Sequence, residues 1–268
     1  FLYYDMSSKA PIGFFDSGIG GTSIWREVQQ LLPKENTLYL ADSRHAPYGA
    51  RPKEEIISLS KKNTEFLLEQ GCKCIVVACN TATTNAISLL RREYEVPFVG
   101  IEPAIKPAAL TSANGRVGVL ATKGTLSSEL FARTSKAHTS GVEVVEVEGT
   151  GLVPLIESGQ LHSPKMTELL TEYTDRFKTA GVDHVVLGCS HYPYLIPQLQ
   201  ALLGSKVTII DSGEAVARRV KDILSQTHLL NTSDDSPKLR FLTNGDLPVL
   251  EAILADIMDP IETEAAEF

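Results

Sequence analysis

Two cysteines lie in the same kind of local sequence although they are far apart in the chain. Cys79 ends the short apolar run Ile75–Ala78, and Cys189 follows the apolar run Val185–Leu187 and a glycine. Each run is brief and rich in β-branched residues, which is typical of a buried parallel strand. Polar residues that can begin a helix follow each cysteine. We therefore predict two thiols, each placed where a strand ends and a helix begins.

The residues after each cysteine indicate how the local structure affects the pKa of its thiol. Asn80 or Thr81 is expected to cap the helix after Cys79, and Pro193 suits the first helical turn after Cys189. A free cysteine has a pKa near ~8.5, and a helix N-terminus favours the thiolate. We therefore expect a lowered pKa at Cys79. A single cysteine is more often a small buried hydrophobe, but the repeated pattern favours a shared site.

A pair of thiols on opposite faces of one carbon can racemise that carbon. One sulfur, as thiolate, removes a proton, and the other, as thiol, donates a proton from the opposite side. This chemistry needs no cofactor. Asp16 could relay a proton beside Cys79, and His191 could do so beside Cys189. The simpler alternatives are a helix-capping role for Asp16 and a structural hydrogen bond for His191.

The elements that position these residues fall into two similar halves. Strands are expected in the first half at Pro11–Phe15, Thr37–Leu40, Ile75–Ala78 and Val96–Gly100, and in the second at Arg116–Leu120, Val142–Val147, Val185–Leu187 and Val207–Ile210. Helical stretches separate the strands. The pattern predicts an α/β protein of two doubly wound, flavodoxin-like domains, each on a parallel sheet, related by pseudo-two-fold symmetry.

The expected strand order within each half, 2-1-3-4, places a crevice between strands 1 and 3. Asp16 and Ser17 then lie beside Cys79, and Thr122 lies beside Cys189. Two facing crevices would enclose one small ligand in the cleft between the domains. The end of the chain is expected to return to the first domain. The predicted domains are therefore residues 9–101 plus 213–268, and residues 102–212.

Hydrogen-bond donors for an acidic ligand are expected in several turns. The glycine-rich turn Asp16–Thr22 is neither G-x-G-x-x-G nor a P-loop, but its backbone N–H groups suit an anion. The loop Ala41–Pro52 carries His45 and Tyr48, as ligand contacts or as ordinary surface residues. Negative charge that develops beside a carboxylate needs fixed donors. The side-chain candidates are Ser17, Asn80, Thr81, Thr122 and Ser190, and Asp16 would suit an ammonium group.

Composition excludes several classes of protein. Of the 268 residues, 43% are hydrophobic and 22% are charged, as in ordinary globular proteins. The net charge of −8 argues against nucleic-acid binding, and no run approaches the ~18 apolar residues of a membrane span. Four cysteines form no disulfide framework and Phe1–Asp5 does not resemble a secretory signal, which predicts a cytoplasmic location. Part of Phe1–Ser8 is interpreted as a processed remnant, and the acidic stretch Asp256–Glu267 as a solvated face or a frayed tail without assigned function.

Five segments carry a family resemblance. They are G-F-F-D-S-G-I-G-G (Gly13–Gly21), A-P-Y-G (Ala46–Gly49), V-V-A-C-N-T-A (Val76–Ala82), V-P-L-I-E (Val153–Glu157) and L-G-C-S-H-Y-P (Leu187–Pro193). Occurring in this order, they resemble the glutamate racemases of the cofactor-independent Asp/Glu racemase family. The resemblance implies interconversion of L- and D-glutamate, which supplies D-glutamate for peptidoglycan, without a cofactor or metal. It also implies a homodimer.

The resemblance also assigns roles by position. Cys79 would be the base for D-glutamate and Cys189 the base for L-glutamate, with Asp16, Glu157 and His191 as supporting groups. The implied substrate contacts are Asp16, Ser17, Tyr48, Gly49, Asn80, Thr81, Thr122, Ser190 and His191.

Two positions depart from the family pattern. Ser190 stands where the family usually has Thr, so a hydroxyl remains and we expect a looser fit. Residues 149–151 are Gly-Thr-Gly rather than the Cys-Pro often found there, which affects the placement of Glu157.

Three alternatives stay open on the sequence. A related aspartate- or hydantoin-type racemase would share the thiol pair, and a two-lobed binding protein for a small acid would share the fold. A metal site of Cys79, Cys189 and His191 is disfavoured because their separations match no zinc-ribbon spacing. An enzyme that uses pyridoxal phosphate is also disfavoured, because the sequence pattern singles out no lysine that could bind this cofactor.

Overall fold

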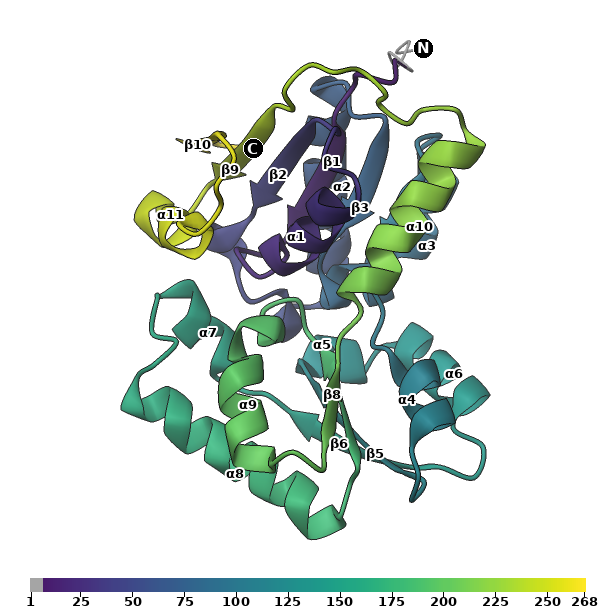
Figure 1. The fold of residues 1–268 in the computed structure, drawn as a ribbon, viewed down its shortest axis with the longest axis vertical. Coiled ribbons are helices and arrows are strands. Elements are labelled where there is room, and N and C mark those ends of the chain that lie inside the picture. The colour runs from purple at the N-terminus through teal and green to yellow at the C-terminus, as the bar shows by residue number, and fades with distance from the viewer. Residues whose placement is uncertain (1–6) are drawn as a thin grey trace.

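The computed structural model describes residues 7–268. It contains two α/β domains, drawn one above the other in Figure 1 and joined where the chain crosses between them twice. The predictions made for Phe1–Asp5 lie outside the described residues, as does most of the predicted remnant. Within residues 7–268, no helix combines the length and the apolar character needed to cross a membrane.

The first domain is built on a parallel six-stranded sheet with the order β10-β9-β2-β1-β3-β4. Its strands are β1 (Ile12–Asp16), β2 (Thr37–Ala41), β3 (Cys74–Val77), β4 (Phe98–Gly100), β9 (Leu239–Thr243) and β10 (Ile261–Ala265). Its helices are α1 (Thr22–Leu31), α2 (Lys53–Glu69), α3 (Asn80–Glu93), α10 (Gly213–Gln226) and α11 (Leu247–Leu254), with short 3-10 turns η1 (Ser43–His45) and η2 (Tyr48–Ala50).

The second domain has a parallel four-stranded sheet with the order β6-β5-β7-β8. Its strands are β5 (Arg116–Ala121), β6 (Glu143–Glu148), β7 (His184–Gly188) and β8 (Thr208–Ile210). Its helices are α4 (Ile105–Thr111), α5 (Lys123–Leu126), α6 (Glu129–His138), α7 (Leu152–Glu157), α8 (Pro164–Ala180), η3 (Tyr192–Leu195) and α9 (Ile196–Leu203). This order matches β2-β1-β3-β4 in the first sheet, because in each domain the second strand, the first, the third and the fourth follow one another across the sheet. The predicted fold class and the predicted 2-1-3-4 order are therefore confirmed.

The core explains why the carboxyl ends of the strands are fixed. β1 is buried along its whole length. Ile12 and Phe14 share an apolar cluster with Trp25 of α1, whereas Phe15 shares another cluster with Leu67 of α2. Alternate side chains of the strand are therefore buried on opposite faces of the sheet, as expected for a parallel sheet covered by helices on both sides. This packing holds Asp16, the last residue of β1, in a defined place.

The end of the chain returns to the first domain. α10 packs against α1, and β9 pairs with β2. The interpretation of Asp256–Glu267 as a frayed tail is wrong, because β10 extends the sheet beside β9 and Phe268 is buried. The alternative of a solvated face agrees with the structure, since the two acidic residues of β10, Glu262 and Glu264, are exposed. Charged side chains are common on edge strands because they discourage pairing with other chains.

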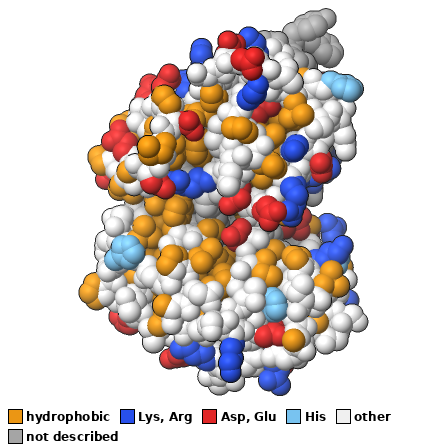
Figure 2. Space-filling model, in the orientation of Figure 1, with side chains coloured by type: hydrophobic (Ala, Val, Ile, Leu, Met, Phe, Trp, Pro, Cys, Tyr) orange, Lys and Arg blue, Asp and Glu red, His pale blue; other side chains and the backbone are white. Residues whose placement is uncertain are grey.

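The chain passes between the domains at residues 101–104 and 211–212. The Ser212 hydroxyl donates a hydrogen bond of 2.5 Å to the Glu102 carbonyl oxygen, so the two crossing segments are joined to each other. Figure 2 shows the two lobes meeting at a narrower waist, with charges of both signs interspersed over this face. The candidate residues lie near this junction.

Candidate active site

Cys79 lies between the end of β3 and the first residue of α3. It has an extended backbone and is itself the N-cap, because its sulfur accepts a hydrogen bond of 3.4 Å from the Ala82 N–H. The helix begins at Asn80, so the prediction that Asn80 or Thr81 would cap it is wrong. The strand–cysteine–helix arrangement is nevertheless the one that the sequence indicates.

Cys189 follows β7 directly and precedes η3, in which Pro193 occupies the first turn as predicted. Its sulfur lines the same cavity as that of Cys79. The residues around this cavity are Ser17, Pro47, Tyr48, Gly49, Cys79, Asn80, Thr81, Thr122, Val153, Cys189, Ser190 and His191. The structure therefore brings together all the predicted site residues except Asp16 and Glu157, which lie behind the cavity wall.

The pKa of the Cys79 thiol is shifted in the direction opposite to the predicted one. Burial raises its pKa well above the usual value, and the Asp16 charge raises it further. The N–H groups of Ala82 and Ser17 lower the pKa but do not reverse the shift. The prediction of a lowered pKa is therefore wrong in this closed arrangement, because the cost of desolvating a thiolate exceeds the effect of the helix end.

Asp16 is completely buried at the end of β1. Its Oδ2 accepts a hydrogen bond of 2.8 Å from the Gly21 N–H, and its Oδ1 accepts one of 3.2 Å from the Ser190 hydroxyl. Burial raises the pKa of Asp16, although His191 opposes the shift. The nearby Cys79 thiol also lowers the pKa of Asp16, but less than burial raises it. Asp16 thus contacts groups on both sides of the cavity and is placed to exchange a proton with Cys79.

His191 connects the second thiol to an acid. Its Nδ1 lies 3.8 Å from Cys189 Sγ, and its Nε2 lies 2.5 Å from Glu157 Oε1. Burial lowers the pKa of His191, but hydrogen bonds to Cys189 and Glu157 and the nearby negative charges raise it well above its usual value. The imidazole approaches closely because Gly20 has no side chain, since a Cβ there would lie 2.2 Å from Nδ1.

Glu157, the last residue of α7, joins the two domains. Its Oε1 accepts a hydrogen bond of 2.7 Å from the Ile19 N–H, and its Oε2 accepts one of 2.7 Å from the Ser43 hydroxyl. The glycine-rich turn was predicted to offer its N–H groups to an anionic ligand. In this closed arrangement the N–H groups of Ile19 and Gly21 instead bind the carboxylates of Glu157 and Asp16.

Asn80 is the clearest ligand-directed group in the site. Its side chain is almost completely buried, yet neither Oδ1 nor Nδ2 has a hydrogen-bond partner among residues 7–268. A buried amide without partners is costly, so a bound molecule with complementary groups would be favoured there. Beside it, the hydroxyls of Thr81 and Thr122 lie 2.8 Å apart and join the two domains.

Tyr48 and Gly49 form part of the wall between the domains. Tyr48 is buried, and its hydroxyl donates a hydrogen bond to Asp42, so it is not free to bind a ligand in the cavity. A Cβ on Gly49 would lie 2.6 Å from the Cβ of Thr122, so the glycine permits close approach of the domains. Two lining residues, Pro47 and Val153, were not predicted from the sequence, and neither was Asp42, which binds the Tyr48 hydroxyl. The available signals were the recognised motifs that contain Pro47 and Val153 and the place of Asp42 directly after a strand.

The cavity between the thiols has a volume of about 10 Å³, which is too small for an amino acid. An outer cavity of about 340 Å³ shares Pro47, Gly49, Thr122 and Val153 with it. These four residues therefore separate the thiols from an entrance between the two domains.

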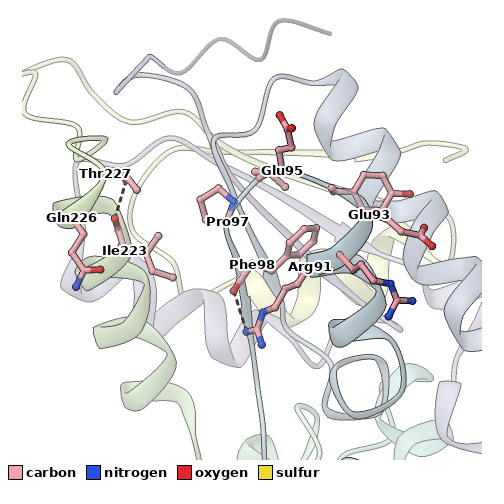
Figure 3. Close-up of a pocket in the computed structure, with 11 residues that line it drawn as sticks. Arg91, Glu93, Glu95, Pro97, Phe98, Ile223, Gln226 and Thr227 are labelled. Atoms are coloured by element: carbon pink, nitrogen blue, oxygen red, sulfur yellow. Dashed lines mark hydrogen bonds between the residues drawn. The ribbon is translucent and has the colours of Figure 1, made fainter. Parts of the chain in front are cut away.

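Another cavity lies away from the thiols. It has a volume of about 670 Å³ and is formed by residues 91–98 together with Ile223, Gln226 and Thr227, near the C-terminal ends of α3 and α10 (Figure 3). Arg91 donates a hydrogen bond of 3.2 Å to the Phe98 carbonyl oxygen beside it. No sequence-predicted site residue lines this cavity. Residues 7–268 contain no cluster of three or more His, Cys, Asp or Glu side chains arranged to hold a metal.

A sequence model described as Asp/Glu/Hydantoin racemase matches residues 20–220. The chain belongs to the Asp/Glu/Hydantoin racemase family. The predicted family resemblance is therefore confirmed. Residues 20–220 of this racemase-family chain include Cys79, Cys189, His191 and Glu157, whereas Asp16 and Ser17 precede the matched region.

Individual racemases resemble the chain over most of its length. It is 46% identical over 251 residues to a glutamate racemase of Ralstonia nicotianae, covering 94% of this chain and 90% of that protein. The structure of glutamate racemase isoform RacE1 from Bacillus anthracis is similar with a TM-score of 0.87 and 30% identity, covering 97% of this chain and 98% of that one. The Escherichia coli glutamate racemase in complex with L-glutamate and the activator UDP-MurNAc-ala has a TM-score of 0.84 and 29% identity, covering 97% and 100%.

Proposed function

We propose that this protein is a cofactor-independent glutamate racemase. The observation that carries the proposal is that Cys79 and Cys189, placed by corresponding strands of two domains, line one cavity. The similarity to glutamate racemases over more than nine-tenths of the chain supports glutamate as the substrate.

The proposed reaction moves one proton on each face of the α-carbon. With D-glutamate bound, the Cys79 thiolate takes the α-proton, and the electron pair of the broken C–H bond delocalises into the α-carboxylate. The Cys189 thiol then gives its proton to the opposite face, which yields L-glutamate, a Cys79 thiol and a Cys189 thiolate. In the reverse direction Cys189 is the base. General acid–base catalysis of this kind contributes about 10²–10⁴-fold to a rate.

The groups behind the cavity would support these transfers. A protonated His191, stabilised by Glu157, places positive charge 3.8 Å from Cys189 Sγ, where it would offset the negative charge that the sulfur acquires when it gives up its proton. The pKa of Asp16 is raised by burial, and its charge and the Cys79 thiol influence each other, so Asp16 would accept or return the proton that Cys79 exchanges. We assign these three residues supporting catalytic roles.

Substrate binding would use the polar wall of the cavity. We assign the contacts to the lining residues Ser17, Tyr48, Gly49, Asn80, Thr81, Thr122, Ser190 and His191, and to Asp16, which lies behind the wall in this closed arrangement. Asn80 has the clearest unused hydrogen-bonding capacity. Since about 10 Å³ cannot hold glutamate, the domains must separate to admit it. We propose that residues 9–101 plus 213–268 move against residues 102–212 about the joined crossing segments.

We further propose that the enzyme acts in the cytoplasm, as a homodimer, to supply D-glutamate for peptidoglycan. Light scattering of the purified protein tests the oligomeric state. Growth of a bacterium depleted of its own glutamate racemase, with and without this chain and with added D-glutamate as the positive control, tests the cellular role.

The substrate is tested by offering L-glutamate, L-aspartate and a hydantoin separately, without added cofactor, and measuring kcat/KM for racemisation. We expect glutamate to exceed the others by at least about 10²-fold. Faster turnover of aspartate or a hydantoin would make the chain a related racemase. Binding without turnover of any of the three would favour a two-lobed binding protein.

A further inference from the structure

The segment between β2 and α2 forms one wall of the cavity. Pro47, Tyr48 and Gly49 line it, and Gly49 lies against Thr122 of the second domain. The same segment contacts the second domain again where the Ser43 hydroxyl donates to Glu157. The position of this segment therefore affects both the shape of the cavity and the closure of the domains.

The Tyr48 hydroxyl is fully engaged inside the first domain. It donates a hydrogen bond to Asp42 Oδ2 and accepts one of 3.1 Å from Asn63 Nδ2 of α2. Burial, followed by the charge of Asp42, holds the pKa of Tyr48 well above its usual value, so the hydroxyl stays a donor. Tyr48 can therefore contribute its ring and backbone to the cavity wall while its oxygen is held from behind.

Asp42 is the centre of this arrangement. Its side chain is almost completely buried, and its Oδ1 accepts hydrogen bonds of 2.5 Å from Asn244 Nδ2 and 2.6 Å from His45 Nδ1. With the bond from Tyr48, three donors face one carboxylate. A buried carboxylate is tolerated when it is hydrogen-bonded in this way, and its bonds have defined geometry.

The returning end of the chain completes the support. Asn244 follows β9, and its Oδ1 accepts a hydrogen bond of 3.0 Å from the Arg44 N–H while its Nδ2 donates to Asp42. A Cβ on Gly245 would lie 2.5 Å from the Cβ of Ser43, and Arg44 forms an ion pair of 2.5 Å with Glu267. The segment is thus held by residues 200 or more positions later in the sequence.

We propose that Asp42 is a positioning residue which, together with Asn63 and Asn244, fixes Tyr48 and thereby aligns residues 47–49 for substrate binding. Asp42 acts through Tyr48 and does not touch the substrate. The inference rests on the proposed function, because its consequence is measured with glutamate. It also gives the returning chain end a role in the site, through Asn244.

The test compares Asp42→Asn, Tyr48→Phe and the double variant. Asp42→Asn keeps the shape of the side chain but turns an amide toward a donor, and Tyr48→Phe removes only the phenol oxygen. We expect each single change to raise KM for glutamate about tenfold, the size of one hydrogen bond to a charged group, with a change in kcat of less than about threefold. The double variant should match the single ones, because all three lose the same contact.

Asp183→Asn is the matched control. Asp183 also accepts several hydrogen bonds, from Ser112 and from the N–H groups of Ala113 and Asn114, but it lies in the second domain and outside the cavity wall. This variant should lose thermal stability without a change in KM. If Asp42→Asn does not fold, Tyr48→Phe alone carries the comparison with the control.

A readout without substrate separates the two proposals. Backbone amides of residues 45–51 should exchange with deuterium faster in Asp42→Asn and Tyr48→Phe than in the parent, and at the parental rate in Asp183→Asn. If the parent protein does not racemise glutamate, the proposed function fails. The hydrogen–deuterium exchange of residues 45–51 then tests by itself whether Asp42 positions this segment. Unchanged KM, multiplied effects in the double variant, or unchanged exchange would each overturn the role of Asp42.

Discussion

His191 Nε2 lies 2.5 Å from Glu157 Oε1, and this contact connects a thiol to the interface between the domains. The imidazole reaches Cys189 through its other nitrogen, and the carboxylate also accepts the Ile19 N–H from the first domain. One carboxylate therefore orients the histidine and holds the closed arrangement. Changes at Glu157 should affect chemistry and stability together.

The contact predicts a pH dependence of stability. His191 has a raised pKa in the folded state, so its protonation stabilises the fold fully below pH 6.5, and this contribution is lost as the pH rises through the folded-state pKa. The melting temperature of the parent should therefore fall as the pH rises above 6.5. In Glu157→Gln the fall should be smaller, as scanning calorimetry would show. The exposed change Glu168→Gln is the control, and an equally steep fall in Glu157→Gln would contradict the assignment.

The Asp16 charge predicts the direction in which the Cys79 pKa changes. Burial and then Asp16 raise this pKa, so Asp16→Asn should lower it while also slowing turnover. The difference in ultraviolet thiolate absorbance between each protein and its Cys79→Ala counterpart measures the ionisation. Cys74 does not interfere below its own pKa, which burial raises to about 12. A Cys79 pKa that is unchanged or higher in Asp16→Asn would show that the carboxylate does not act on the thiol.

A buried ion pair predicts the stability of the first domain. Lys73 Nζ lies 2.6 Å from Glu35 Oε2 and donates to the carbonyl oxygens of Ser8 and Leu229, and both charged side chains are buried. Lys73→Met should lower the free energy of unfolding by about 3–5 kcal/mol, because it leaves a buried carboxylate unpaired. Adding Glu35→Leu should recover part of the loss. Urea denaturation measures both, and a double variant less stable than Lys73→Met would refute this explanation.

The two thiols predict equivalent losses of activity. Cys79→Ser and Cys189→Ser should each lower kcat for racemisation in both directions by about 10²–10⁴-fold, since each direction uses one sulfur as base and the other as acid. Cys72→Ala is the control, because Cys72 is a buried free thiol that does not line the cavity. Initial rates from L- and D-glutamate are the measurement. Near-parental rates in either serine variant would exclude the two-thiol mechanism.

Most of the fold could be predicted from the sequence, because short local patterns indicate where the strands and helices lie. Short β-branched runs marked the central strands, and the repeated strand–cysteine–polar pattern placed both Cys79 and Cys189 at strand ends. The rule that ligands bind at the carboxyl ends of parallel strands then predicted a crevice beside each cysteine, and both sheets have the strand order that this prediction assumed. Such predictions depend on residues that are close in sequence.

The remaining features depend on contacts that a linear pattern does not contain. The sign of the Cys79 pKa shift follows from how completely the closed domains exclude water, which a helix-end argument cannot give. β10 was missed because an acidic edge strand has the composition of a solvated tail. The support of Tyr48 by Asp42 joins the segment to Asn244, whose side chain comes from the far end of the sequence.

The most direct test of the two-thiol site follows the α-proton. Purified protein is incubated with L-glutamate in deuterated water without added cofactor, while loss of the α-proton is followed by NMR and optical rotation is recorded in parallel. The proposed mechanism predicts that the α-proton signal and the optical rotation both fall to zero as L-glutamate becomes racemic, α-deuterated glutamate. It also predicts that Cys79→Ser and Cys189→Ser abolish this conversion. Retention of the α-proton together with optical activity in the parent protein would contradict it.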